Sequence, residues 1–97
     1  MELDRRIAQV ERTVGKRLIV RGVRTPEPEL RGYVEVRPGS VLIEYCERLP
    51  GYFWEYELLE TLLEWVEAGG GSAYFYEHRG GLIRVPFDLG EPEGREK

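Results

Sequence analysis

Apolar residues recur every three or four positions in two parts of the chain, which predicts two amphipathic helices. The first series consists of Leu3, Ile7, Val10 and Val14. Gly15 follows directly and favours a helix end, because glycine adopts the left-handed conformation of a C-terminal cap without steric cost. The second series lies in residues 51–71, GYFWEYELLETLLEWVEAGGG, and also ends at glycines.

Between the two helices the pattern changes to the shorter period and β-branched composition of strands. Residues 17–24, RLIVRGVR, predict a strand with Leu18 and Val20 facing inward and Arg17 and Arg21 facing outward. The TPEPEL segment that follows holds two prolines within three positions and predicts a loop.

Two further segments have the pattern of β-hairpins. In GYVEVRPGSVLIEYC, a turn at Pro38 and Gly39 places apolar residues opposite one another on one face, with Val36 opposite Val41 and Val34 opposite Ile43. The other face then pairs Glu35 with Leu42 and Tyr33 with Glu44.

In SAYFYEHRGGLIRVPFD, Gly80 and Gly81 suit a tight turn that needs positive φ angles. That turn predicts four cross-strand pairs: Tyr76 with Val85, His78 with Ile83, Tyr74 with Phe87, and Glu77 with Arg84.

The order of elements is helix, three strands, helix, two strands, which predicts an α+β fold. We expect a single domain over residues 1–87, with an antiparallel sheet of about five strands covered by the two helices. Residues 88–97 are rich in Pro, Gly and charge, and we expect them to form a flexible C-terminal tail.

The second helix carries more apolar surface than packing on one sheet requires. At 100° per residue, one arc faces the sheet and consists of Tyr52, Tyr56, Leu59, Leu62, Leu63 and Val66. A second arc beside it consists of Trp54, Leu58, Thr61 and Trp65. Three coverings of this second arc are open: the N-terminal helix, an identical subunit, or a foreign partner.

The same helix carries an acidic stripe at intervals of three, four and three, formed by Glu57, Glu60, Glu64 and Glu67. None of these glutamates has a basic residue four positions later. A solvated acidic face is one interpretation. An ion-pair network with Arg17, Arg21, Arg37 or the N-terminal helix, a basic protein partner, and a divalent-metal site are the others.

Composition and charge narrow the class of protein. Arg far outnumbers Lys, Glu far outnumbers Asp, and Asn is absent, which indicates a thermophile, although a GC-rich genome also favours Arg. No apolar run has the length of a membrane span or signal peptide, so we expect a cytoplasmic protein without membrane contact. The net charge of −4 argues against nucleic-acid binding. Tyr74, Phe75 and Tyr76 could stack on bases, but the acidic helix would repel phosphate.

No motif of a phosphate-binding loop, dinucleotide site, zinc protease or serine hydrolase is present, and we assign no catalytic, cofactor-binding or metal-binding residues. His78 is the only histidine and Cys46 the only cysteine. We expect His78 at a surface turn and Cys46 in strand packing.

The leading hypothesis is a non-enzymatic interaction module that forms a homodimer through Trp54, Leu58, Thr61 and Trp65. The alternative is a small ligand-binding, metal-binding or catalytic domain that uses glutamates with His78 or Cys46.

Overall fold

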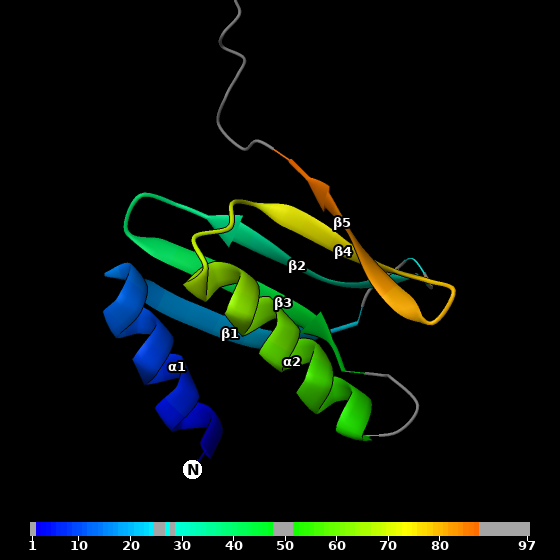
Figure 1. The fold of residues 1–97 in the computed structure, drawn as a ribbon, viewed down its shortest axis with the longest axis horizontal. Coiled ribbons are helices and arrows are strands. Elements are labelled where there is room, and N and C mark those ends of the chain that lie inside the picture. The colour runs from blue at the N-terminus through cyan, green and yellow to red at the C-terminus, as the bar shows by residue number, and fades with distance from the viewer. Residues whose placement is uncertain (1, 25–26, 28, 48–51, 88–97) are drawn as a thin grey trace, which may run out of the picture.

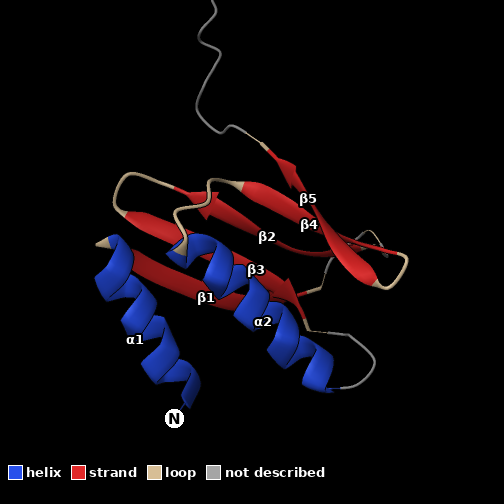
Figure 2. Ribbon diagram, viewed as in Figure 1, coloured by secondary structure: helices blue, strands red, loops and turns tan. Residues whose placement is uncertain are grey.

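The structure is a computed structural model that describes residues 2–24, 27, 29–47 and 52–87, without the side chains of residues 2 and 52–56. Its elements follow the predicted order (Figures 1 and 2). They are α1 (Glu2–Val14), β1 (Arg17–Val23), β2 (Leu30–Val36), β3 (Ser40–Cys46), α2 (Tyr52–Glu67), β4 (Ala73–His78) and β5 (Gly81–Pro86). The predicted tail, residues 88–97, lies outside the described residues.

The N-terminal helix and the strand after it have the predicted form. Helix α1 ends as expected at Gly15, which has a φ of 70° and donates its N–H to the carbonyl of Glu11 at 2.8 Å. In β1, Leu18 is buried in the core while Arg17 and Arg21 are exposed. Val20 is half-buried against the same core, so the predicted inward and outward faces of this strand are confirmed.

The first hairpin has the predicted register. Val36 lies opposite Val41 and Val34 opposite Ile43 on one face, and Glu35 and Tyr33 lie opposite Leu42 and Glu44 on the other. The turn closes with an N–H from Arg37 to the carbonyl of Ser40 at 2.8 Å.

The sheet is mixed, and the prediction of a purely antiparallel sheet is wrong at one pair of strands. The strand order is β1-β3-β2-β4-β5, and β1 runs parallel to β3. Strand β3 takes the position between β1 and β2 because Val41, Leu42 and Ile43 are apolar on both faces and all three are buried. Such a continuous apolar run is typical of an interior strand.

The second hairpin has a different register from the predicted one. Its turn is formed by Arg79 and Gly80, whose φ angles are 54° and 81°, and not by Gly80 and Gly81. Positive φ at both central residues is the geometry of the type I′ turn that two-residue hairpins favour. Tyr76 therefore lies opposite Ile83, and His78 lies opposite Gly81.

This shift moves each partner by two positions, so every side chain keeps its face of the sheet. Tyr74 faces Val85, and Phe87 lies beyond the paired residues of the ladder. Arg84 lies opposite Phe75 instead of Glu77. Glu77 instead accepts a hydrogen bond from Arg31 Nε at 2.9 Å. Arg84 is thereby placed over α2.

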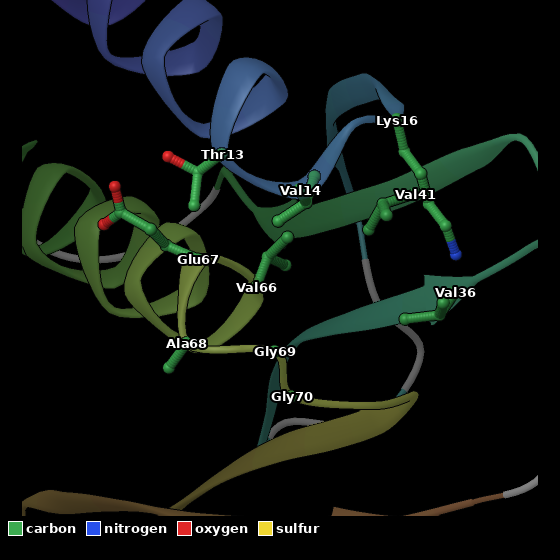
Figure 3. Close-up of a pocket in the computed structure, with 10 residues that line it drawn as sticks. All are labelled: Thr13, Val14, Lys16, Val36, Val41, Val66, Glu67, Ala68, Gly69 and Gly70. Atoms are coloured by element: carbon green, nitrogen blue, oxygen red, sulfur yellow. The ribbon is translucent and has the colours of Figure 1, made fainter.

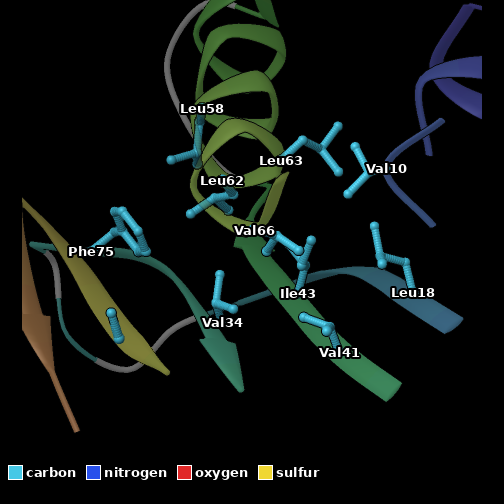
Figure 4. Packing of buried hydrophobic residues seen from close by; sticks show 11 residues of the cluster. Val10, Leu18, Val34, Val41, Ile43, Leu58, Leu62, Leu63, Val66 and Phe75 are labelled. Atoms are coloured by element: carbon cyan, nitrogen blue, oxygen red, sulfur yellow. The ribbon is translucent and has the colours of Figure 1, made fainter. Parts of the chain in front are cut away.

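Both helices lie on one face of the sheet, with α2 across the central strands and α1 beside it (Figure 1). The core lies between these layers (Figure 4) and consists of Val10, Leu18, Val34, Val41, Ile43, Leu58, Leu62, Leu63, Val66, Ala73 and Phe75. We call the sheet face opposite the helices the open face. Within the described ranges, no helix has the length and apolar character required to cross a membrane.

Candidate interaction surface

Two of the four residues of α2 that were expected to form an interface, Leu58 and Trp65, make contacts within the chain. Leu58 is 1% exposed and belongs to the core. Thr61 is exposed and donates its hydroxyl to the carbonyl of Glu57 at 3.0 Å. The side chain of Trp54 lies outside the described residues.

Trp65 is covered by the second hairpin, a source that the helical pattern did not indicate. Its ring meets Phe75 edge to face with centroids 6.1 Å apart, and its indole N–H donates to the carbonyl of Gly71 at 2.7 Å. The guanidinium carbon of Arg84 lies 4.4 Å from the ring centroid, within the range of a cation–π contact. Trp65 thus joins α2 to β4 and β5.

The close approach of Trp65 explains one of the glycines after α2. A Cβ atom on Gly70 would lie 2.2 Å from Cε2 of Trp65, well inside van der Waals contact. Gly69, one residue earlier, has a φ of 87° and ends the helix in the left-handed conformation. The glycines end the helix and leave room for the indole.

The acidic stripe of α2 divides into two pairs. Arg6 of α1 donates Nη2 to Glu60 at 2.9 Å and to Glu67 at 2.8 Å, so one guanidinium joins the two helices. The hydrogen bond from Arg6 holds the pKa of Glu67 below its usual range. Glu57 and Glu64 are exposed. The N-terminal helix, one of the expected sources, therefore supplies the basic group for Glu60 and Glu67.

The open face carries a cluster of four aromatic rings, Tyr33, Tyr74, Tyr76 and Phe87. Tyr74 stacks on Phe87 with centroids 4.4 Å apart, and it lies 5.9 Å from Tyr33 and 6.2 Å from Tyr76. All four side chains are half-buried by one another and by the sheet. Phe75 points to the opposite face and is buried in the core, as alternation along the strand predicted.

Charged pairs border this aromatic cluster. Arg21 pairs with Glu44, and Arg37 Nε lies 2.7 Å from Glu35. Burial and a hydrogen bond to the Glu44 carboxylate together raise the pKa of Tyr33 to about 12. The phenol of Tyr33 is consequently held in its neutral, donating form.

The Tyr33 environment predicts a late-titrating tyrosine. Tyr33 should ionise near pH 12 instead of its usual value of about 10. The folded state then holds a proton that the unfolded chain loses earlier, so the stability contributed by this phenol is complete below pH 10 and is lost as the pH rises toward 12. Titration of tyrosinate absorbance, with Tyr33→Phe as the reference, measures the pKa.

A matched variant separates the two causes of this pKa shift. Glu44→Gln removes the carboxylate but leaves the burial, so the Tyr33 pKa should fall part of the way toward its usual value. A Tyr33 that titrates like an exposed tyrosine in the parent protein would contradict the described environment.

Strand β5 leaves apolar side chains exposed beside the aromatic cluster. Ile83 is 46% exposed and Val85 is 43% exposed, and they are the exposed large hydrophobic residues of the described chain. Both lie on the open face, opposite Tyr76 and Tyr74 respectively. Sequence patterns did not reveal this pair, because its exposure depends on the position of β5 at the end of the sheet order and not on the strand alone. The alternation in GLIRVP was the available signal.

The two residues weighed for chemistry lie apart from one another. His78 is exposed at the end of β4, and Cys46 is buried at the end of β3, with β2 between the two strands. Among the residues that the structure describes, no three His, Cys, Asp or Glu side chains gather in a way that would hold a metal ion.

A cavity of about 370 Å³ lies where the two helices end above the first hairpin (Figure 3). Three polar side chains line it, and each already has a partner. Thr13 donates to the carbonyl of Gln9, and Lys16 donates to the carbonyl of Arg37 at 2.9 Å. Glu67 is paired with Arg6. The remaining lining side chains are Val14, Val36, Val41, Val66 and Ala68, beside Gly69 and Gly70.

Comparison of the chain with protein-family models, with curated proteins and with solved structures finds no match. Function is therefore inferred from the surfaces of the molecule itself.

Proposed function

We propose that this protein is a non-enzymatic interaction module that acts as a homodimer, with β5 in the contact. The observation that carries the proposal is the exposure of Ile83 and Val85 side by side on a strand that has one neighbour among the described strands. Branched aliphatic side chains on an edge strand favour association, because burying them removes apolar surface from water and an edge offers backbone groups for pairing.

A second copy of the chain is the partner we favour. A chain of 97 residues buries a smaller share of its surface than a larger domain does, so association adds stability that its single core lacks. In a twofold dimer each contact occurs twice, so one small patch contributes on both sides. Trp65 and Leu58 are engaged within the chain, which leaves β5 as the more available apolar surface.

Support for a non-enzymatic role comes from the polar side chains of the cavity. Thr13, Lys16 and Glu67 all have partners within the chain, so none is held ready as an acid, base or nucleophile.

The composition supports a compartment and a type of organism for this module. We place the module in the cytoplasm of a thermophile, where Arg-mediated ion pairs such as those of Arg6 retain their value at high temperature. The exposed carboxylates of Glu57 and Glu64 suit a basic segment of a further protein bound by the dimer.

Native mass spectrometry at low micromolar concentration tests the proposal. We expect the parent protein to be a dimer and the Ile83→Glu/Val85→Glu variant to be a monomer, because association would bury two charges per copy. Thr13→Glu is the matched control, since Thr13 is exposed on α1, which packs against α2 and β1. A parent protein that stays monomeric over the accessible concentrations would contradict the proposal.

A further inference from the structure

We propose that the dimer forms by antiparallel pairing of β5 with β5 of a second copy, with Ile83 facing the same residue across the twofold axis. This inference rests on the proposed function and specifies its contact. The pairing joins two five-stranded sheets into one continuous sheet.

The outer edge of β5 can be derived from its pairing with β4. His78 and Gly81 close the two-residue turn, and the N–H of Phe87 donates to the carbonyl of Ser72 at 3.0 Å. In an antiparallel ladder, alternate residues direct both backbone groups to the same neighbour. Ile83 and Val85 therefore bond to β4, while the N–H and C=O groups of Leu82 and Arg84 point away from it.

None of the described strands pairs with the outer edge of β5, because β5 is the last strand in the sheet order. The opposite edge, β1, is protected in two ways. The N–H of Leu18 is taken by the Glu11 carboxylate at 2.9 Å, and the exposed charges of Arg17 and Arg21 lie along that strand. Charged side chains on an edge strand discourage pairing with another chain.

Donors and acceptors select one register of self-pairing. If Leu82 faces Arg84 of the second copy, each of these residues both donates and accepts across the new edge. A shift that places Arg84 opposite itself brings like charges together and sets Leu82 against Pro86, which has no N–H. A shift the other way sets Arg84 against Gly80, which lies in the turn.

The side chains of β5 fit this register. Ile83 falls at a position where the facing residues are not hydrogen-bonded to each other, and such pairs have the closest side chains in an antiparallel ladder. Ile83 would therefore bury its exposed surface against Ile83 of the second copy. The Arg84 guanidinium lies over Trp65 of its own helix, which draws this charge toward α2 and away from the edge.

This arrangement also places the two open faces on the same side of the joined sheet. Rotation about a twofold axis perpendicular to the sheet leaves each face on its own side. The helices of both copies therefore cover the same side of the joined sheet. The two aromatic clusters then lie on the other side as parts of one surface.

Disulfide cross-linking tests the register. In a Cys46→Ala background, Ile83→Cys should form an intermolecular disulfide nearly completely under mild oxidation by oxidised glutathione. Facing Cα atoms at a non-hydrogen-bonded position are about 4.5 Å apart, within the range that a disulfide spans. Val85→Cys is the matched control on the same face, and it should stay reduced because Val85 would face Gly81 of the second copy.

The outcomes separate the register from the proposed function. A parent protein that is dimeric by native mass spectrometry, with Val85→Cys cross-linking as well as Ile83→Cys or in its place, would overturn this register. Failure of Ile83→Cys to cross-link in a dimer that still forms would also overturn it. Absence of any dimer would overturn the proposed function as well.

A proline variant tests the backbone bonds themselves. Arg84→Pro removes an outward N–H that β4 does not use, and should raise the dimer dissociation constant by at least about tenfold. Arg84→Ala loses the same contact with Trp65 but keeps the N–H, so it should remain near the parent value. Equal dissociation constants for the two variants would overturn pairing through the β5 edge.

Discussion

Replacement of Leu62 by alanine should lower the free energy of unfolding by about 2–5 kcal/mol, the largest effect we expect from a single truncation. Leu62 is fully buried at the centre of α2 and belongs to the core between helix and sheet (Figure 4). Its Cδ1 atom lies 3.3 Å from where a Cβ of Gly32 would stand, so the strand beneath has no side chain at that point to fill a cavity. The truncation therefore loses both apolar burial and packing contacts.

Urea unfolding of the variant at fixed protein concentration measures this loss. Thr61→Ala is the matched control, because Thr61 is the preceding residue and is exposed. Its effect should stay within about 0.5 kcal/mol. A Leu62→Ala variant that loses less than about 1 kcal/mol would contradict the described core.

Trp65→Ala should lower the free energy of unfolding by about 3 kcal/mol, near the lower end for buried aromatic residues because Trp65 is only half-buried. The change removes the edge-to-face contact with Phe75, the hydrogen bond to the Gly71 carbonyl and the cation–π contact with Arg84. We expect it to leave the assembly state unchanged, because these contacts are made within the chain.

Two measurements separate this expectation from a role of Trp65 in the interface. Urea unfolding reports the stability loss, and native mass spectrometry above the dissociation constant reports the subunit number. Trp65→Phe is the control, since it retains an aromatic contact with Phe75 and should recover part of the stability. A Trp65→Ala protein of parental stability that no longer dimerises would show that the indole belongs to the interface.

Local patterns predicted those parts of the fold that depend on neighbouring residues. Helix α1, its end at Gly15 and the register of the β2–β3 hairpin all follow from periodicity and a short turn. The β4–β5 register was missed because Arg79, and not Gly81, takes a positive φ next to Gly80. Residues other than glycine seldom adopt that conformation, so two adjacent glycines were a misleading signal.

Long-range order was harder to predict. The segments of β1 and β2 follow one another in the chain, and consecutive strands usually lie side by side. Strand β3 separates them because Leu42 is buried on the open face as Val41 and Ile43 are buried under the helices. The apolar run in VLIEYC was visible in the sequence, but which strands would flank it was not.

The surface on α2 illustrates a similar limit. Periodicity identified an apolar arc wider than one sheet needs, and Leu58 and Trp65 do lie on that arc. It did not reveal that the second hairpin packs against Trp65, since that contact depends on the course of the chain after Gly71. The exposure of Ile83 and Val85 depends likewise on the position of β5 at the end of the sheet order.

The position of β3 between β1 and β2 also constrains the order in which the chain folds. The β2–β3 hairpin closes locally, and hairpins of this kind form in microseconds. Strand β1 must then pair in parallel with residues 40–46. Leu18 and Val20 therefore cannot reach their native neighbours until β3, which is synthesised later, is available. We expect α1 and β1 to be synthesised before β3 and yet to be among the last elements to reach their native contacts.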